Sequence, residues 1–88
     1  MSVVMADLDL HGFTGDAAER RLEDFLITHA VRSPGQVVRV ITGRGAGSSG
    51  APVVQQRVRD LITGRLSHRV EDWAVDIGGG AYLIRMRS

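Results

Sequence analysis

The segment VVRVITGRGAGSSGAPVVQQRV, residues 37–58, decides the fold because it joins an apolar strand to a helix through a glycine-rich loop. Residues 37–41 are almost wholly apolar and rich in β-branched side chains, which is typical of a buried β-strand. The next nine residues, 42–50, contain four glycines, and Pro52 fits the first turn of a helix. Apolar residues then recur on one helical face, at Val54, Val58, Leu61, Ile62 and Leu66. The pattern predicts a strand, a loop and a helix over about 52–65.

A second strand and helix precede this segment. The apolar run Val3–Leu10 predicts a strand that is buried on much of both faces, and His11-Gly12 ends it. Thr14 is a candidate N-cap for a helix over about 15–30, because its hydroxyl can accept from the first free backbone amides. The Ser33-Pro34-Gly35 run then breaks that helix.

The C-terminal part of the chain predicts a hairpin. Val70–Ile77 alternates as a strand with Trp73 in the core, Gly78-Gly79-Gly80 forms the turn, and Ala81–Met86 is the last strand. The order is therefore β-α-β-α-β-β. Strands that are joined through a helix run parallel and the hairpin is antiparallel. We expect one α/β (α+β) domain over residues 1–88, a two-layer sandwich with a mixed four-stranded sheet and two helices.

Composition limits the possible chemistry. The chain has no cysteine, which excludes disulfides, thiolate zinc sites and cysteine nucleophiles. It has no apolar run long enough for a membrane span and no basic start of a signal peptide, so we expect a cytoplasmic protein without membrane partners. Residues 1–35 carry a formal charge of −3 and residues 36–88 a charge of +4, with arginine as the only basic residue besides histidine. This asymmetry permits an anionic partner without requiring one.

Asp9 and His11 are the first candidate site. They stand two residues apart at the end of a strand, so an extended backbone points them to the same side. A carboxylate beside an imidazole can orient it for acid–base work. Spacing alone leaves an equal alternative, in which His11 merely caps the strand.

The glycine-rich loop is the second candidate site. Its backbone amides can approach a phosphate closely, and the start of the following helix adds further donors. The spacing Gly45-x-Gly47-x-x-Gly50 matches the dinucleotide fingerprint, but the chain is too short for a doubly wound domain and the required acidic residue is missing. The alternative is a flexible connector. We expect the loop to be exposed, and mobile unless it binds an anion. Both candidate loops follow parallel strands, so His11 and Arg44 should share one edge of the sheet.

The other notable residues favour structural roles. His29 closes the apolar face of the first helix, His68 lies in a connector, and no His, Asp or Glu spacing resembles a metal site. The glycines at 78–80 are most simply a turn that needs positive φ.

Three motifs together resemble one family. Leu8-Asp9-Leu10-His11-Gly12, Thr42-Gly43-Arg44-Gly45 and Gly79-Gly80-Ala81 are similar, in this order, to the Smr (small MutS-related) domain. The resemblance covers nearly the whole chain. It implies a fold similar to the C-terminal domain of translation initiation factor 3, nucleic-acid binding, and in many members endonuclease or nicking activity. Many relatives have histidine at the position of Thr42, and we expect this chain to lack the N-terminal extension of some members.

The resemblance implies residue roles as well. Asp9, His11 and Arg44 would be catalytic, and the nucleic-acid-binding positions would be Gly43, Arg44, Gly45, Gly47 and Ser48. The partner would be RNA or DNA, in the setting of the ribosome or of repair and recombination machinery, and we expect a monomer. The sequence requires no cofactor, although cleavage of DNA would call for a divalent metal. The competing hypothesis is a module that grips phosphates through the same loop and cuts nothing.

Overall fold

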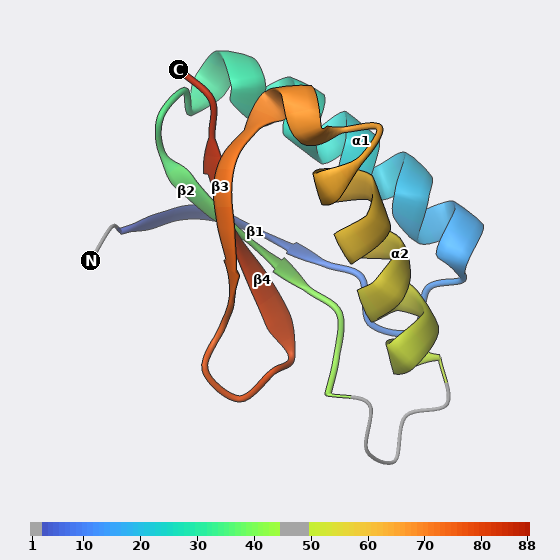
Figure 1. Ribbon diagram of the computed structural model, residues 1–88. Coiled ribbons are helices and arrows are strands. Elements are labelled where there is room, and N and C mark those ends of the chain that lie inside the picture. Colours follow the sequence, from blue (N-terminus) through green and yellow to red (C-terminus); the bar gives the residue numbers. More distant parts are fainter. Residues whose placement is uncertain (1–2, 45–49) are drawn as a thin grey trace.

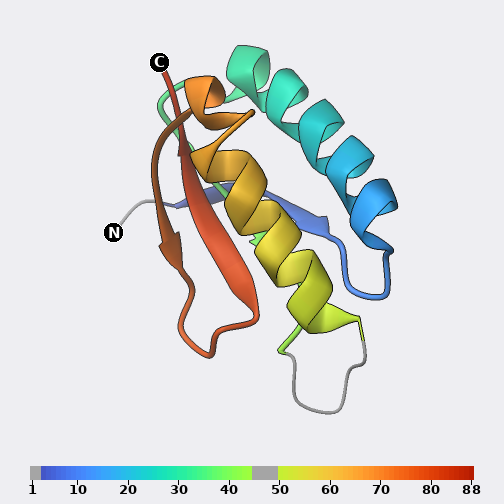
Figure 2. The ribbon, with the colours of Figure 1, turned by 45° about the vertical axis from the view of Figure 1, so that its right-hand side comes forward.

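The computed structural model describes residues 3–44 and 50–88 and forms two layers (Figure 1). Helices α1 and α2 lie together on one face of a four-stranded sheet, and the opposite face carries no helix (Figure 2). The predicted α+β sandwich is confirmed. In chain order the elements are β1 (Val4–Asp9), α1 (Gly15–Arg32), β2 (Val37–Ile41), α2 (Ala51–Thr63), the 3₁₀ turn η1 (Ser67–Arg69), β3 (Val70–Val75) and β4 (Ala81–Met86).

The sheet has the strand order β1-β2-β4-β3. β1 and β2 pair in parallel, and β4 pairs antiparallel with both β2 and β3. The connection from β2 to β3 through α2 leaves these two strands apart, and the last strand, β4, inserts between them. This insertion brings the β3–β4 turn beside the carboxyl end of β2, where residues 42–44 follow. The end of β1, the end of β2 and this turn all lie at the same end of the molecule (Figure 1).

The core lies between the sheet and the helices. Alternate residues of β2 and β4 point into it, and both helices contribute their apolar stripes, as the sequence periodicity predicts. Core side chains that are completely buried include Leu10, Leu22, Leu26, Val38, Val40, Val58, Ile84 and Met86. Thr14 caps α1 as expected, since its hydroxyl accepts from the amide of Ala17 at 3.2 Å. No helix in the described part of the chain is long and apolar enough to cross a bilayer.

Ion pairs join the acidic side chains of α1 to two arginines of the C-terminal half. Arg57 on α2 lies 3.0 Å from Asp16 and 2.9 Å from Glu19 on α1. Arg65 lies 2.7 Å from Glu19 and 2.8 Å from Glu23. Hydrogen bonds from Arg65 first, and then from Arg57, lower the pKa of Glu19 despite partial desolvation. Two of the eight arginines in residues 36–88 therefore hold α2 and the residues just after it against α1.

Three details of the sequence-based prediction were wrong. Val3 and Met5 are 77% and 54% exposed, because β1 is an edge strand and the sheet face away from the helices is uncovered. α2 ends at Thr63 rather than near residue 65, where Gly64 follows it and the amide of Leu66 returns to the carbonyl of Leu61. β3 ends at Val75, so Ile77 lies outside the strand and is almost fully exposed.

Candidate nucleic-acid and phosphodiester site

Asp9 and His11 form a hydrogen-bonded pair at the end of β1. Asp9 Oδ1 accepts from the backbone amide of His11 at 3.0 Å and lies 2.7 Å from His11 Nδ1. The side chains are 51% and 72% exposed, so solvent and any long polymer can reach both. The backbone amide of His11 is the main cause of a lowered Asp9 pKa, followed by the imidazole. The carboxylate therefore stays ionised at neutral pH.

The ionised carboxylate sets the tautomer of His11. A carboxylate can only accept hydrogen bonds, so Nδ1 of the imidazole must be the donor in the 2.7 Å contact. In the neutral ring the unprotonated nitrogen is then Nε2. Asp9 thus presents His11 as a base whose free lone pair is on the nitrogen that does not contact the carboxylate.

Gly43 lies directly beside His11. The amide of Leu10 donates to the carbonyl of Ile41 at 2.7 Å. This bond extends the β1–β2 pairing to the point where both strands end. Gly43 has a φ of +93°, and a Cβ atom there would lie 3.4 Å from Ala51 Cβ and 3.8 Å from His11 Cβ. The backbone before Arg44 therefore runs between His11 and the first residue of α2, in a conformation that glycine favours.

Arg44 extends over the β3–β4 turn. Cβ atoms placed on Gly78 and Gly80 would lie 3.3 Å from Arg44 Nη2 and 3.2 Å from Arg44 Cγ. The amides of Thr42 and Gly43 both donate to the carbonyl of Gly80, at 2.9 and 3.1 Å. The structure therefore brings His11 and Arg44 to one sheet edge, as the parallel topology predicts. His11 lies beside Gly43 along that edge, and the side chain of the next residue, Arg44, extends over the β3–β4 turn.

Sequence reasoning missed two residues that hold this segment. Gln55, in the second turn of α2, donates from Nε2 to the carbonyl of Gly43 at 2.6 Å. The hydroxyl of Tyr82 on β4 donates to the carbonyl of Gln55 at 3.2 Å. Thr42 is buried, and its hydroxyl lies 3.4 Å from the carbonyl of Gly80. The only sequence signal for Gln55 is a polar residue next to the buried stripe of a helix, which does not identify a partner.

Some predicted positions lie outside the described residues, and others have structural roles. Gly45, Gly47 and Ser48, with the predicted exposure and mobility of their loop, lie outside the described residues. His29 is half-buried and packs on the ring of Phe25, with Nδ1 2.9 Å from the hydroxyl of Ser33, which fits the structural role expected for it. Within residues 3–44 and 50–88, no group of three His, Cys, Asp or Glu side chains could hold a metal ion.

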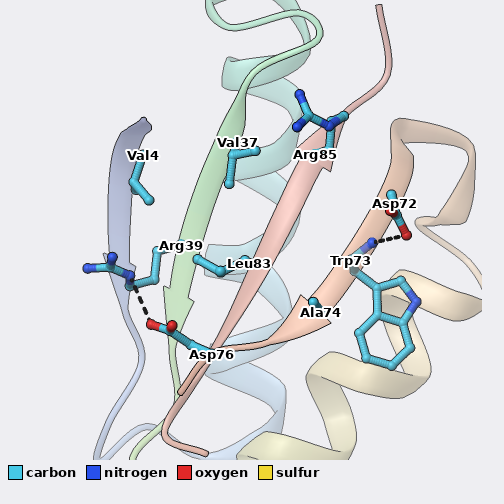
Figure 3. Close-up of a pocket in the computed structure, with 9 residues that line it drawn as sticks. All are labelled: Val4, Val37, Arg39, Asp72, Trp73, Ala74, Asp76, Leu83 and Arg85. Atoms are coloured by element: carbon cyan, nitrogen blue, oxygen red, sulfur yellow. Dashed lines mark hydrogen bonds and ion pairs between the residues drawn. The ribbon is translucent and has the colours of Figure 1, made fainter. Parts of the chain in front are cut away.

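A pocket of about 210 Å³ lies on the uncovered face of the sheet (Figure 3). Arg39 and Asp76 both line it and lie side by side, with Arg39 Nε 3.4 Å from an Asp76 carboxylate oxygen. Arg39 also lies 3.7 Å from Asp7. None of the predicted site residues lines this pocket, and two of its charged side chains, Arg39 and Asp76, already pair with each other. The sheet edge that carries Asp9, His11 and Arg44 is therefore the better candidate site.

Comparison of this chain with known proteins gives a family match and a similar solved structure. The family model described as "Smr domain" matches residues 8–87. The solution structure of the Smr domain of NEDD4-binding protein 2 has a TM-score of 0.68 and 27% sequence identity. That alignment covers 100% of this chain and 91% of the compared chain. A search of curated protein sequences gives no match.

Proposed function

This chain belongs to the Smr domain family, and from that premise we propose that it binds nucleic acid and cleaves its phosphodiester backbone as an endonuclease. The observation that carries the proposal is the Asp9–His11 pair beside Gly43 and Arg44. It combines an oriented proton acceptor with a guanidinium at one accessible edge. These two kinds of group accelerate phosphodiester cleavage, one by proton transfer and the other by stabilising charge on the phosphate.

For an RNA substrate, the 2′-hydroxyl is the nucleophile. His11 Nε2 accepts the hydroxyl proton as the 2′-oxygen bonds to phosphorus, and the bond from phosphorus to the 5′-oxygen breaks. The leaving 5′-oxygen takes a proton from solvent, so the products are a cyclic phosphate and a 5′-hydroxyl. Asp9 fixes the imidazole in the tautomer that this step needs and stabilises the imidazolium that forms.

Arg44 supplies the electrostatic part of the mechanism. A guanidinium can donate two parallel hydrogen bonds to phosphate oxygens and stabilises the charge that accumulates in the transition state. Gly43 lacks a side chain, so the backbone that leads into Arg44 can pass between His11 and Ala51. DNA has no 2′-hydroxyl and would need an activated water, with a divalent metal ion. The described residues provide only Asp9 as a carboxylate of this site, so we assign no step to a metal that the protein holds.

The test is incubation of the purified protein with labelled single-stranded RNA and with supercoiled DNA, each with and without Mg²⁺, followed by analysis of the product ends. We expect RNA fragments with cyclic phosphate and 5′-hydroxyl ends, without a need for Mg²⁺. Salt-sensitive binding with no product from either substrate would contradict the endonuclease and support the module that only grips phosphates. No binding to either polymer would contradict both functions.

A further inference from the structure

Arg59 differs in what it contacts from Arg57 on α2 and from Arg65, which follows the end of α2. Arg57 and Arg65 are tied to carboxylates of α1. Arg59 is exposed on α2 and forms no ion pair with any described carboxylate. Its positive charge is therefore available to an outside anion, as is that of Arg44.

Arg59 lies over aromatic rings. Its Cζ is 5.3 Å from the centre of the Trp73 ring and 6.0 Å from that of Tyr82, and the two rings meet edge to face at 5.8 Å. The indole of Trp73 turns toward the α2 side, away from the cluster formed by Arg39, Asp76 and Leu83 (Figure 3). A cation over an aromatic face is held there by the ring quadrupole, which limits the freedom of the guanidinium. Its outward N–H groups remain free to donate to an acceptor.

This aromatic support connects directly to the candidate site. Tyr82 donates to the carbonyl of Gln55, and Gln55 donates to the carbonyl of Gly43, which precedes Arg44. Arg59 follows Gln55 by four residues, so it lies one helical turn, about 6 Å, farther along α2. The guanidinium of Arg59 is therefore one turn farther from Gly43 than Gln55 is, over the rings of Trp73 and Tyr82 on β3 and β4.

We infer that Arg59, supported by Trp73 and Tyr82, is a second contact for a single-stranded nucleic acid whose cleaved phosphate lies at His11 and Arg44. The inference rests on the proposed nucleic-acid binding and extends its footprint. The guanidinium fork can bind a backbone phosphate, and the outer plane of the guanidinium can stack on an unpaired base. Such stacking needs an unpaired base, so we expect Arg59 to contact a single strand rather than a duplex.

The alternative role for Arg59 is purely structural, as a cover for the half-buried Trp73. A structural cover would affect stability and leave affinity unchanged. Measurement of affinity and melting on the same variants separates the two roles. Arg59 is exposed and glutamine is a good helix former, so we expect Arg59→Gln to fold.

The experiment measures anisotropy of a short and a long fluorescein-labelled oligouridylate over a range of salt concentrations. We expect the wild-type protein to bind the long strand more tightly. Arg59→Gln should raise the Kd for the long strand about tenfold and lower the slope of log K against log salt by about 0.7. It should remove most of the gain in affinity with length. Arg59→Lys should retain the salt slope and recover only part of the affinity, because it keeps the charge without the fork.

Arg32→Gln is the matched control, since it removes the same charge from the last turn of α1, at the opposite end of β2 from Gly43. We expect it to change neither Kd nor salt slope. If Arg59→Gln binds like the wild type while the wild type binds with steep salt dependence, the second contact is wrong and the proposed function stands. An equal loss of affinity for single strands and for a hairpin duplex would contradict the expected preference of Arg59 for a single strand. A wild-type protein that binds no oligonucleotide would instead contradict the proposed function.

Discussion

The side-chain amide of Gln55 donates a hydrogen bond of 2.6 Å to the carbonyl oxygen of Gly43. This contact joins α2 to the segment that leads out of β2, across a gap of twelve residues in sequence. Gly43 needs support there because its φ of +93° is a conformation that side chains rarely adopt. The peptide that the bond fixes is the one that joins Gly43 to Arg44. Gln55 therefore fixes the backbone that leads into Arg44.

Loss of the Gln55 contact should disturb the site more than the fold. We expect Gln55→Ala to lower the free energy of unfolding by about 1 kcal/mol, because one hydrogen bond to a backbone carbonyl is removed. The cleavage rate should fall by a larger factor than the affinity, because a small displacement of a positioned group slows the reaction. Gln56→Ala is the neighbouring control, since Gln56 bonds only the exposed Asp60. Equal kinetic effects of the two substitutions, in a cleavage assay beside a denaturant titration, would contradict the role of Gln55.

The β3–β4 turn offers a matched pair of glycines. Gly78 and Gly79 have φ values of +96° and +77°, so alanine at either position should destabilise the fold by about 1 kcal/mol or more. A Cβ on Gly78 would lie 3.3 Å from the Arg44 guanidinium, whereas a Cβ on Gly79 would contact nothing within 4 Å. Gly78→Ala should therefore also weaken nucleic-acid binding, and Gly79→Ala should not. Thermal melting and anisotropy on both variants check this, and equal losses of affinity would rule out a shared surface of Arg44 and the turn.

Arg44 is expected to act in both binding and turnover. Arg44→Ala should weaken affinity and rate together, because a guanidinium on a phosphate contributes in the ground state and in the transition state. Arg44→Lys should recover binding better than turnover, since it restores the charge without the bidentate geometry. Separate measurement of Kd and of single-turnover cleavage tests this. Full recovery of turnover by lysine would contradict the bidentate role.

Glu19 gives the fold a pH dependence. Its pKa is lowered from the ordinary 4.5 by Arg65 and then by Arg57, so its stabilising effect is fully present above that value. The effect is lost as the pH falls through the lowered pKa of the folded state. Glu19→Gln should therefore melt below the wild type at pH 7, and the two melting temperatures should converge in stronger acid.

Glu71→Gln is the control for this titration, because Glu71 is exposed on β3 and takes no part in the helix–helix ion pairs. We expect its melting temperature to follow that of the wild type at every pH. A constant offset between Glu19→Gln and the wild type, down to strongly acidic pH, would show that the effect of Glu19 is not ionic.

The local pattern of the sequence predicts most of the fold. β2 and β4 occupy the predicted residues, and Asp9 and His11 lie on one side because an extended strand places residues i and i+2 together. The common edge of His11 and Arg44 follows from parallel β1 and β2. Each of these features depends on neighbours in sequence or on a general rule of chain topology.

The remaining features depend on contacts between distant segments. The insertion of β4 between β2 and β3 brings the Gly80 carbonyl to the amides of Thr42 and Gly43, and no local pattern encodes that pairing. The exposure of Met5 follows from the edge position of β1, which periodicity does not report. The contact of Gln55 with Gly43 and the support of Arg59 by Trp73 likewise arise only when α2 packs beside β4.

The most direct test of the central claim measures the cleavage rate and the affinity of His11→Ala on the same labelled single-stranded RNA. Asp9 orients His11 as a proton acceptor, so we expect the substitution to reduce cleavage by roughly 10²–10⁴-fold. Affinity should stay within a few-fold of the wild type, because the imidazole contributes little to binding. A parallel loss of affinity and cleavage in a folded His11→Ala protein would contradict the claim and make His11 a contact residue.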